Sequence, residues 1–258
     1  MKRKPYHRIY RRVHAGQRNA GYSSTAYIRD PQYANAASHY LRAYNLIQSD
    51  LQKLFEYVEP SEKSIDTYSF RIHELLMRTC IEVEANFKAI LAENTFTPEE
   101  NRFGPIFNMG VYQKVNKSHH LSDNAVFLPE WNGERRIWKP FEAWGIGERI
   151  EWYQAYNASK HDRKEAFSAA NLEVLINSVA GLLVLLSSQF ETQDFSAGGV
   201  VLSAGDDYDY HEFEPAIGSM FRISFPDAWD NDELYDFDWQ ELKDQDDRFQ
   251  KFNYDEVE

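Results

Sequence analysis

The chain of 258 residues has one cysteine and no long hydrophobic run. The single Cys80 excludes an intrachain disulfide framework and a cysteine-rich zinc site. The longest uninterrupted apolar stretch, Val179 to Leu186, is far shorter than the roughly 20 residues that cross a bilayer. The first residues are basic and aromatic and do not form the apolar region of a secretory signal. We therefore expect a cytoplasmic protein with no membrane partner.

Acidic residues are missing from the first 20 positions, which carry seven Lys and Arg. Residues 206–258 show the reverse, with 18 acidic and four basic positions. Such a basic arm can contact phosphate backbones, which the acidic tail would mimic or repel. Alternatively, arm and tail contact each other or a neighbouring subunit, or are simply solvated. We favour this second interpretation because charge runs at termini are commonly interaction or solubility segments.

The composition is that of a folded chain, with 43% hydrophobic and 15% aromatic residues. Apolar residues recur at helical spacing from Ala34 to Val58 and from Thr67 to Ala92. Cys80 lies on the apolar face of the second segment, so we interpret it as a small buried hydrophobe. On the opposite face, Arg78 and Glu82 have the spacing of an ion pair.

Residues 101–147 are less regular. We predict a short helix over 106–115 and then an aromatic-rich connection, 127–144, that wraps the helices. His119 and His120 are adjacent, and no carboxylate stands at a ligand-like spacing beside them, so we predict no metal site.

Two further helical stretches follow, one from Gly147 and a strongly apolar one from Phe167 to Phe190. Their combined length predicts a break near Ser159 to Asp162. Beyond them, residues 198–202 and 220–225 have the composition of two short strands in a hairpin or edge pair. Pro226 begins the acidic tail.

A polar cluster at the predicted break carries the strongest functional signal. It runs from Tyr156 to Arg163 and reads Tyr-Asn-Ala-Ser-Lys-His-Asp-Arg. In a helix, Asn157 and His161 lie one turn apart on one face, with Tyr156, Lys160 and Arg163 on the adjoining face. A neutral imidazole can take a proton from a ribose hydroxyl, and the cations can stabilise charge on phosphoryl oxygens.

The same residues also permit a purely structural interpretation. Asn157 and His161 can form a buried hydrogen-bonded pair that fixes helix packing. From spacing alone we favour this interpretation over catalysis, with non-catalytic phosphate binding as a third alternative.

The order of features is similar to that of uncharacterised bacterial proteins related to the HEPN superfamily. The similarity rests on the helix containing Glu74–Glu84, the loop Pro140–Trp144, the segment Trp152–Arg163 and the apolar helix after it. That superfamily is a helical bundle found in RNases of toxin–antitoxin, abortive-infection and CRISPR-associated systems. Its catalytic members carry Arg, a polar residue that is often Asn, three or more variable positions and then His. They cleave RNA without a metal, usually as dimers.

This chain matches the superfamily motif at Asn157 and His161 and departs from it at the Arg position, which is Tyr156. The resemblance implies a homodimer and no cofactor. Two functions are consistent with it. In the first, the protein is a metal-independent endoribonuclease in which His161 is the general acid and base, Asn157 orients it, and Lys160 and Arg163 hold phosphate.

In the second, the chain is an inactive HEPN-like module that binds RNA, a nucleotide or a partner protein through the same surface, in phage defence or a toxin–antitoxin-type system. We place this function first because of Tyr156, which is then a third phosphate-binding residue. The acidic tail is the expected contact for a protein partner.

The predicted fold is mainly α, an antiparallel helical bundle with a small β element and an acidic C-terminal tail. We divide the chain into a basic arm (1–30), a helical bundle (31–193) and the β element with the tail (194–258).

Overall fold

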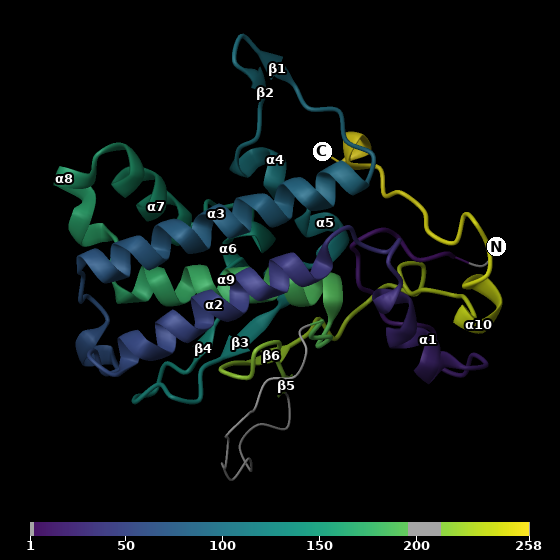
Figure 1. Ribbon diagram of the computed structural model, residues 1–258, viewed down its shortest axis with the longest axis horizontal. Helices are drawn as coiled ribbons and strands as arrows, with labels where there is room; N and C mark the ends of the chain where they lie inside the picture. Colours follow the sequence, from purple (N-terminus) through teal and green to yellow (C-terminus); the bar gives the residue numbers. More distant parts are fainter. Residues whose placement is uncertain (1–2, 196–212, 258) are drawn as a thin grey trace.

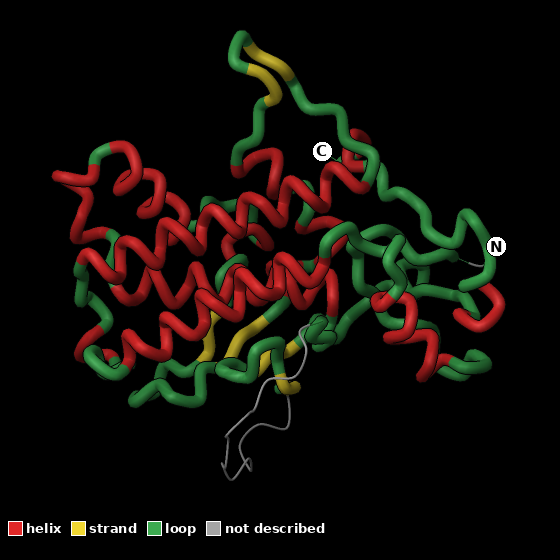
Figure 2. The backbone as a smooth tube through the Cα atoms, viewed as in Figure 1, coloured by secondary structure: helices red, strands yellow, loops and turns green. Residues whose placement is uncertain are grey.

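The computed structural model describes residues 3–195 and 213–257. Within these residues the protein is mostly helical, with small antiparallel sheets (Figures 1 and 2). This confirms the mainly α prediction. The longest helices are α2 (Ala37–Phe55), α3 (Phe70–Glu93), α7 (Glu151–His161) and α9 (Leu172–Phe190).

Helix α3 packs against α9, α2 and α7. Its start is fixed by Ser69, whose side chain accepts a hydrogen bond from the backbone N–H of Ile72 at 3.2 Å. Cys80 is fully buried in it, as predicted, and burial raises the pKa of its thiol. Arg78, which we expected to pair with Glu82, instead donates to the Asp50 carboxylate on α2.

Helix α9 is the core helix predicted from its composition. Asn171 caps its start by accepting a hydrogen bond from the Val174 N–H at 3.0 Å. It is long and apolar enough to cross a membrane, yet 83% of its most apolar window is buried inside the protein.

The main sheet has the order β4-β3-β6-β5 and is antiparallel. Its strands are β3 (Ala125–Phe127), β4 (Ile137–Trp138), β5 (Glu214–Pro215) and β6 (Arg222–Ser224). The predicted strand at 220–225 is therefore present as β6. Residues 198–202, its predicted partner, lie outside the described residues, and β6 pairs with β3 and β5.

The aromatic-rich connection packs on the helices as predicted, because Trp131, Trp138 and Trp144 are all buried. Sequence periodicity did not reveal that β3 ends where this connection begins or that β4 lies within it. A second pair, β1 (Glu100–Asn101) and β2 (Gly104–Pro105), forms a hairpin that projects from the helices (Figure 1). The short helices are α1 (Ala20–Ala26), α4 (Met109–Gln113), α5 (Asn116–His119), α6 (Glu142–Gly145), α8 (Arg163–Ala166) and α10 (Trp239–Leu242).

The two charged terminal segments lie against each other, as the favoured interpretation allowed. Parallel bridges join Tyr6 to Gln250 and Val13 to Tyr235. Lys4 forms an ion pair with Asp247 at 2.9 Å. Aromatic side chains of the acidic tail are also part of the core; these are Tyr235, Phe237, Trp239 and Tyr254.

Two arginines of the basic arm are buried within this arrangement. Arg8 is 0% exposed and Arg11 is 4% exposed. Arg8 bonds the Glu93 carboxylate, and Arg11 donates to the backbone oxygen of Glu233 at 3.1 Å. Neither guanidinium is available to a phosphate backbone.

Candidate functional site

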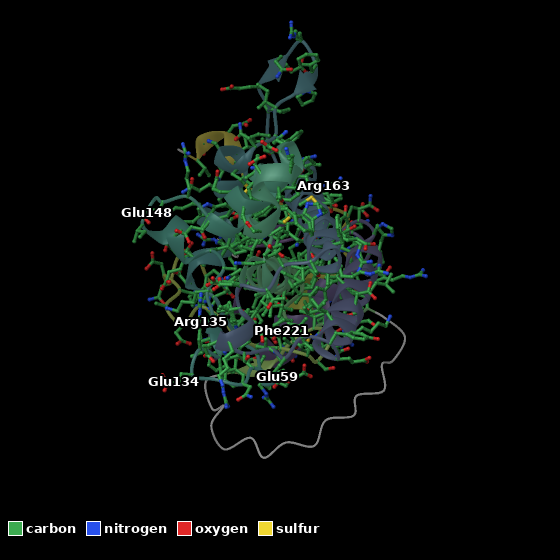
Figure 3. All side chains as sticks on the ribbon, turned by 90° about the vertical axis from the view of Figure 1, so that its left-hand side faces the viewer. Glu59, Glu134, Arg135, Glu148, Arg163 and Phe221 are labelled. Carbon is green, nitrogen blue, oxygen red and sulfur yellow. The ribbon has the colours of Figure 1, made fainter. Side chains whose placement is uncertain are left out.

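The predicted cluster lies where α7 ends and α8 begins. His161 is the last residue of α7, and Asp162 caps α8 by accepting a hydrogen bond from the Glu165 N–H at 3.3 Å. The predicted break near Ser159 to Asp162 is thus present. Figure 3 looks onto this end of the molecule, with Arg163 labelled.

His161, Arg163 and Lys164 are exposed and line one open recess of about 510 Å³ with Asp162, Phe70 and Phe167. Two cations, Arg163 and Lys164, and one imidazole thus share the recess with one carboxylate. The burial of His161 that the structural interpretation required is not found. The recess has the charge to hold a phosphate group, and His161 is accessible to it.

Asn157 is half-buried one turn before His161 on α7. Within residues 3–195 and 213–257, no hydrogen bond joins Asn157 to His161. The endoribonuclease hypothesis assigns to Asn157 the role of orienting the imidazole. In this structure the amide does not do so.

Tyr156 is 1% exposed and points away from the recess. Its hydroxyl donates to Glu84 Oε1 at 3.2 Å and accepts a hydrogen bond from Lys160 Nζ at 3.2 Å. The Lys160 ammonium also lies 5.1 Å from the centre of the Tyr156 ring. The predicted phosphate-binding role of Tyr156 has no direct geometric basis here. Its side chain is buried, and only Lys160, which contacts it, is exposed.

Glu84 of α3 is the polar centre beneath α7. Its Oε1 also accepts a hydrogen bond from Tyr153 at 2.9 Å. Burial, followed by the nearby Glu84 carboxylate, raises the pKa of both Tyr153 and Tyr156. The two hydroxyls therefore stay protonated as donors, and this network fixes α7 on α3.

A partly exposed aromatic cluster adjoins the recess, which two of its members, Phe70 and Phe167, line, and the sequence did not predict it. Phe167 is its centre, with ring centroids 4.8 Å from Phe70, 5.7 Å from Tyr68 and 5.6 Å from His73. Phe70 is 70% exposed and Tyr68 is 52% exposed. Periodicity could not reveal this cluster, because nearly 100 residues separate Phe70 from Phe167. The only sequence signal was two aromatic residues at a helix start.

Among the described residues, no group of three or more His, Cys, Asp or Glu side chains has the arrangement of a metal site. His119, the buried member of the His119–His120 pair, bonds the Arg8 carbonyl oxygen and the Ser118 hydroxyl instead. Comparison of the chain with protein-family models, curated proteins and solved structures finds no match.

Proposed function

We propose that this protein is a HEPN-like antiparallel helical bundle that binds single-stranded RNA at the recess between α7 and α8. The observation that carries the proposal is the meeting of exposed basic side chains with two aromatic rings, of which Phe70 is exposed and Phe167 is half-buried. His161, Arg163 and Lys164 line the recess from one side, and Phe70 and Phe167 from the other.

These two groups suit the two parts of a nucleotide chain. Arg163 and Lys164 attract the phosphates, in a binding term that weakens as salt rises. The faces of Phe70 and Tyr68 can stack on unpaired bases, an interaction worth about 1–3 kcal/mol per base. Bases within a duplex are already stacked and cannot use this platform. We therefore place RNA ahead of a free nucleotide or a protein partner, with phage defence or a toxin–antitoxin-type system as its context.

The test is fluorescence anisotropy with a labelled single-stranded RNA. Replacing Arg163 and Lys164 together with Ala should weaken binding and lower the salt slope by about 0.7 for each lost phosphate contact. Phe70→Ala should weaken binding without changing that slope. The matched controls are Lys243→Ala with Lys251→Ala for the cations and Phe103→Ala for the aromatic residue, all of which are exposed elsewhere. Equal affinities for all variants would refute the proposal.

A second candidate function is metal-independent RNA cleavage with His161 as general acid and base. The exposure of His161 beside Arg163 favours it. We place it second because Asn157 does not orient the imidazole and Tyr156 occupies the position of the motif Arg. Incubation with RNA in EDTA distinguishes the two functions. Cleavage that disappears in His161→Ala would establish the enzyme, and binding without cleavage would establish the module.

A further inference from the structure

Asp162 supplies the one carboxylate among the described residues that line the recess. It is exposed and lies between His161 and Arg163 in the sequence, yet in the part of the chain that the structure describes it has no ion-pair partner. Its one hydrogen bond there is the bond that Oδ1 accepts from the Glu165 N–H at 3.3 Å. The Asp162 carboxylate therefore has acceptor capacity left for a bound molecule.

The capping of α8 does not by itself require a negative charge at this position. Asn caps the start of a helix as well as Asp does. In the recess the charge also opposes the binding of phosphate, because it offsets one of the two cations. The Lys164 ammonium is already 3.9 Å from the Glu165 carboxylate outside the recess lining. A carboxylate at position 162 favours binding only where the ligand donates hydrogen bonds to it.

The four RNA bases differ in the donors that they offer to a carboxylate. Guanine presents N1–H and an N2 amino group side by side, which match the two oxygens of one carboxylate. Adenine and cytosine each present one amino group next to a ring acceptor, and uracil presents one N–H between two carbonyl oxygens. Exposed base edges of this kind are how single-stranded RNA is read. We propose that Asp162 selects guanine as the base that binds in the recess.

The other sides of the recess fit the same base. Guanine O6 is an acceptor next to N1–H, and the neighbours of Asp162 in the recess, His161 and Arg163, are donors. Both are exposed, and no hydrogen bond or ion pair within the described ranges occupies either side chain. The exposed ring of Phe70 provides the stacking surface. This inference rests on the proposed binding of single-stranded RNA and adds to it the identity of one base.

Fluorescence anisotropy with short labelled uridine oligonucleotides measures the preference. Each strand carries one variable base at its centre, so that no strand has enough guanine to form a quadruplex. The native chain should bind the guanine strand about fivefold or more tightly than the strands with adenine, cytosine or uracil. Replacement of guanine by hypoxanthine, which lacks the N2 amino group, should remove part of this advantage.

Asp162→Asn is the decisive variant, because the amide oxygen can still cap α8 while the second carboxylate acceptor and the charge are lost. It should lose the preference for guanine. It should bind the all-uridine strand at least as tightly as the native chain does, since one negative charge near the phosphates is gone. Glu165→Gln is the matched control. It removes an exposed carboxylate three residues away that is outside the recess lining, and it should keep the preference.

The possible outcomes separate this inference from the proposed function. Equal affinity of the native chain for all four bases would overturn the selection of guanine and leave RNA binding in place. A preference that Asp162→Asn retains would place the selection at another residue. A preference that Glu165→Gln also loses would show a general effect of charge, and either result would overturn the role of Asp162. Failure to bind any strand would overturn the proposed function itself and this inference with it.

Discussion

Arg8 Nε lies 2.7 Å from Glu93 Oε1, and the Arg8 side chain is completely buried. The same guanidinium donates to Gln189 Oε1 at 2.9 Å and to the Asn35 carbonyl oxygen. An arginine near the N-terminus therefore connects the ends of α3 and α9 to the segment before α2. What the charge pattern presents as a basic arm is at this position part of the core.

Replacement of Arg8 by Met should lower the free energy of unfolding by about 3–5 kcal/mol, because it leaves Glu93 and the buried Gln189 without their charged partner. Urea unfolding followed by circular dichroism measures the loss. Arg12→Met is the control, since the Arg12 side chain is 44% exposed and 3.9 Å from Asp227. It should change stability by less than ~1 kcal/mol. Equal losses in both variants would contradict the structural role of Arg8.

His119 should make the protein sensitive to mild acid. Burial lowers the pKa of its imidazole from 6.5 to about 3, so the folded chain holds it neutral. Below pH 6.5 the unfolded chain binds a proton that the folded chain does not bind, and this group then costs up to about 1.4 kcal/mol of stability per pH unit. Stability should therefore fall as pH decreases from 6.5 towards 3.

The measurement is urea unfolding between pH 7 and pH 5 for the native chain and for His119→Gln. The variant should start less stable, because the hydrogen bonds to Ser118 and Arg8 change, but its stability should depend less steeply on pH. His161→Gln is the control, since His161 is exposed, and should retain the native slope. If the stability of His119→Gln depended on pH as steeply as that of the native chain, other groups would be the cause of the acid sensitivity.

The sequence predicts the parts of this fold that depend on local spacing. The apolar residues of α2, α3 and α9 recur every three or four positions. Helices α2 and α9 lie within their predicted ranges, and α3 ends one residue beyond its range, at Glu93. The charge pattern describes the termini less well. It cannot show that Tyr235 and Tyr254 of the acidic tail are core residues or that Val13 forms a bridge with Tyr235, because these contacts join distant segments.

In the candidate site, too, local features could be predicted from the sequence and contacts between distant segments could not. Local sequence places His161, Lys160 and Arg163 at a helix break, and the break is where the cluster predicted it. Which of the cluster's side chains reach the surface depends on how α7 packs on the other helices. Tyr156 is next to Asn157 in the sequence, yet its hydroxyl points to Glu84 on another helix. The aromatic side of the recess depends on the packing of Phe167 against Phe70, which no local pattern encodes.

Tyr156→Phe tests whether this tyrosine supports the site or binds phosphate itself. The variant removes one hydrogen bond to Glu84 and the acceptor of Lys160, so unfolding should require about 1–2 kcal/mol less. RNA affinity should change little, because the hydroxyl is buried. Tyr57→Phe, at a side chain 85% exposed, should leave stability unchanged. A large loss of RNA affinity with native stability would mean that Tyr156 takes part in RNA binding directly.

Gly133 leaves space for a carboxylate that organises the connection between β3 and β4. Glu62 Oε1 accepts hydrogen bonds from the Arg135 backbone N–H and from Trp131 Nε1, both at 2.9 Å. These bonds lower the pKa of Glu62 to about 2, and the bond from the Arg135 N–H has the largest effect. A side chain at position 133 would overlap with this carboxylate. Gly133→Ala should therefore displace Glu62 and leave the indole N–H of the buried Trp131 without its acceptor.

Two measurements follow from this displacement. The pKa of Glu62, followed by NMR, should rise towards its usual 4.5. In the native chain, the lowered pKa contributes stability that is present above pH 4.5 and is lost as pH falls towards 2, so Gly133→Ala should lose this part of the acid dependence. Gly21→Ala is the control, because its added carbon has no atom within 4 Å apart from its chain neighbours and the backbone of its own helix. A native Glu62 pKa in Gly133→Ala would mean that the carboxylate keeps its donors despite the overlap.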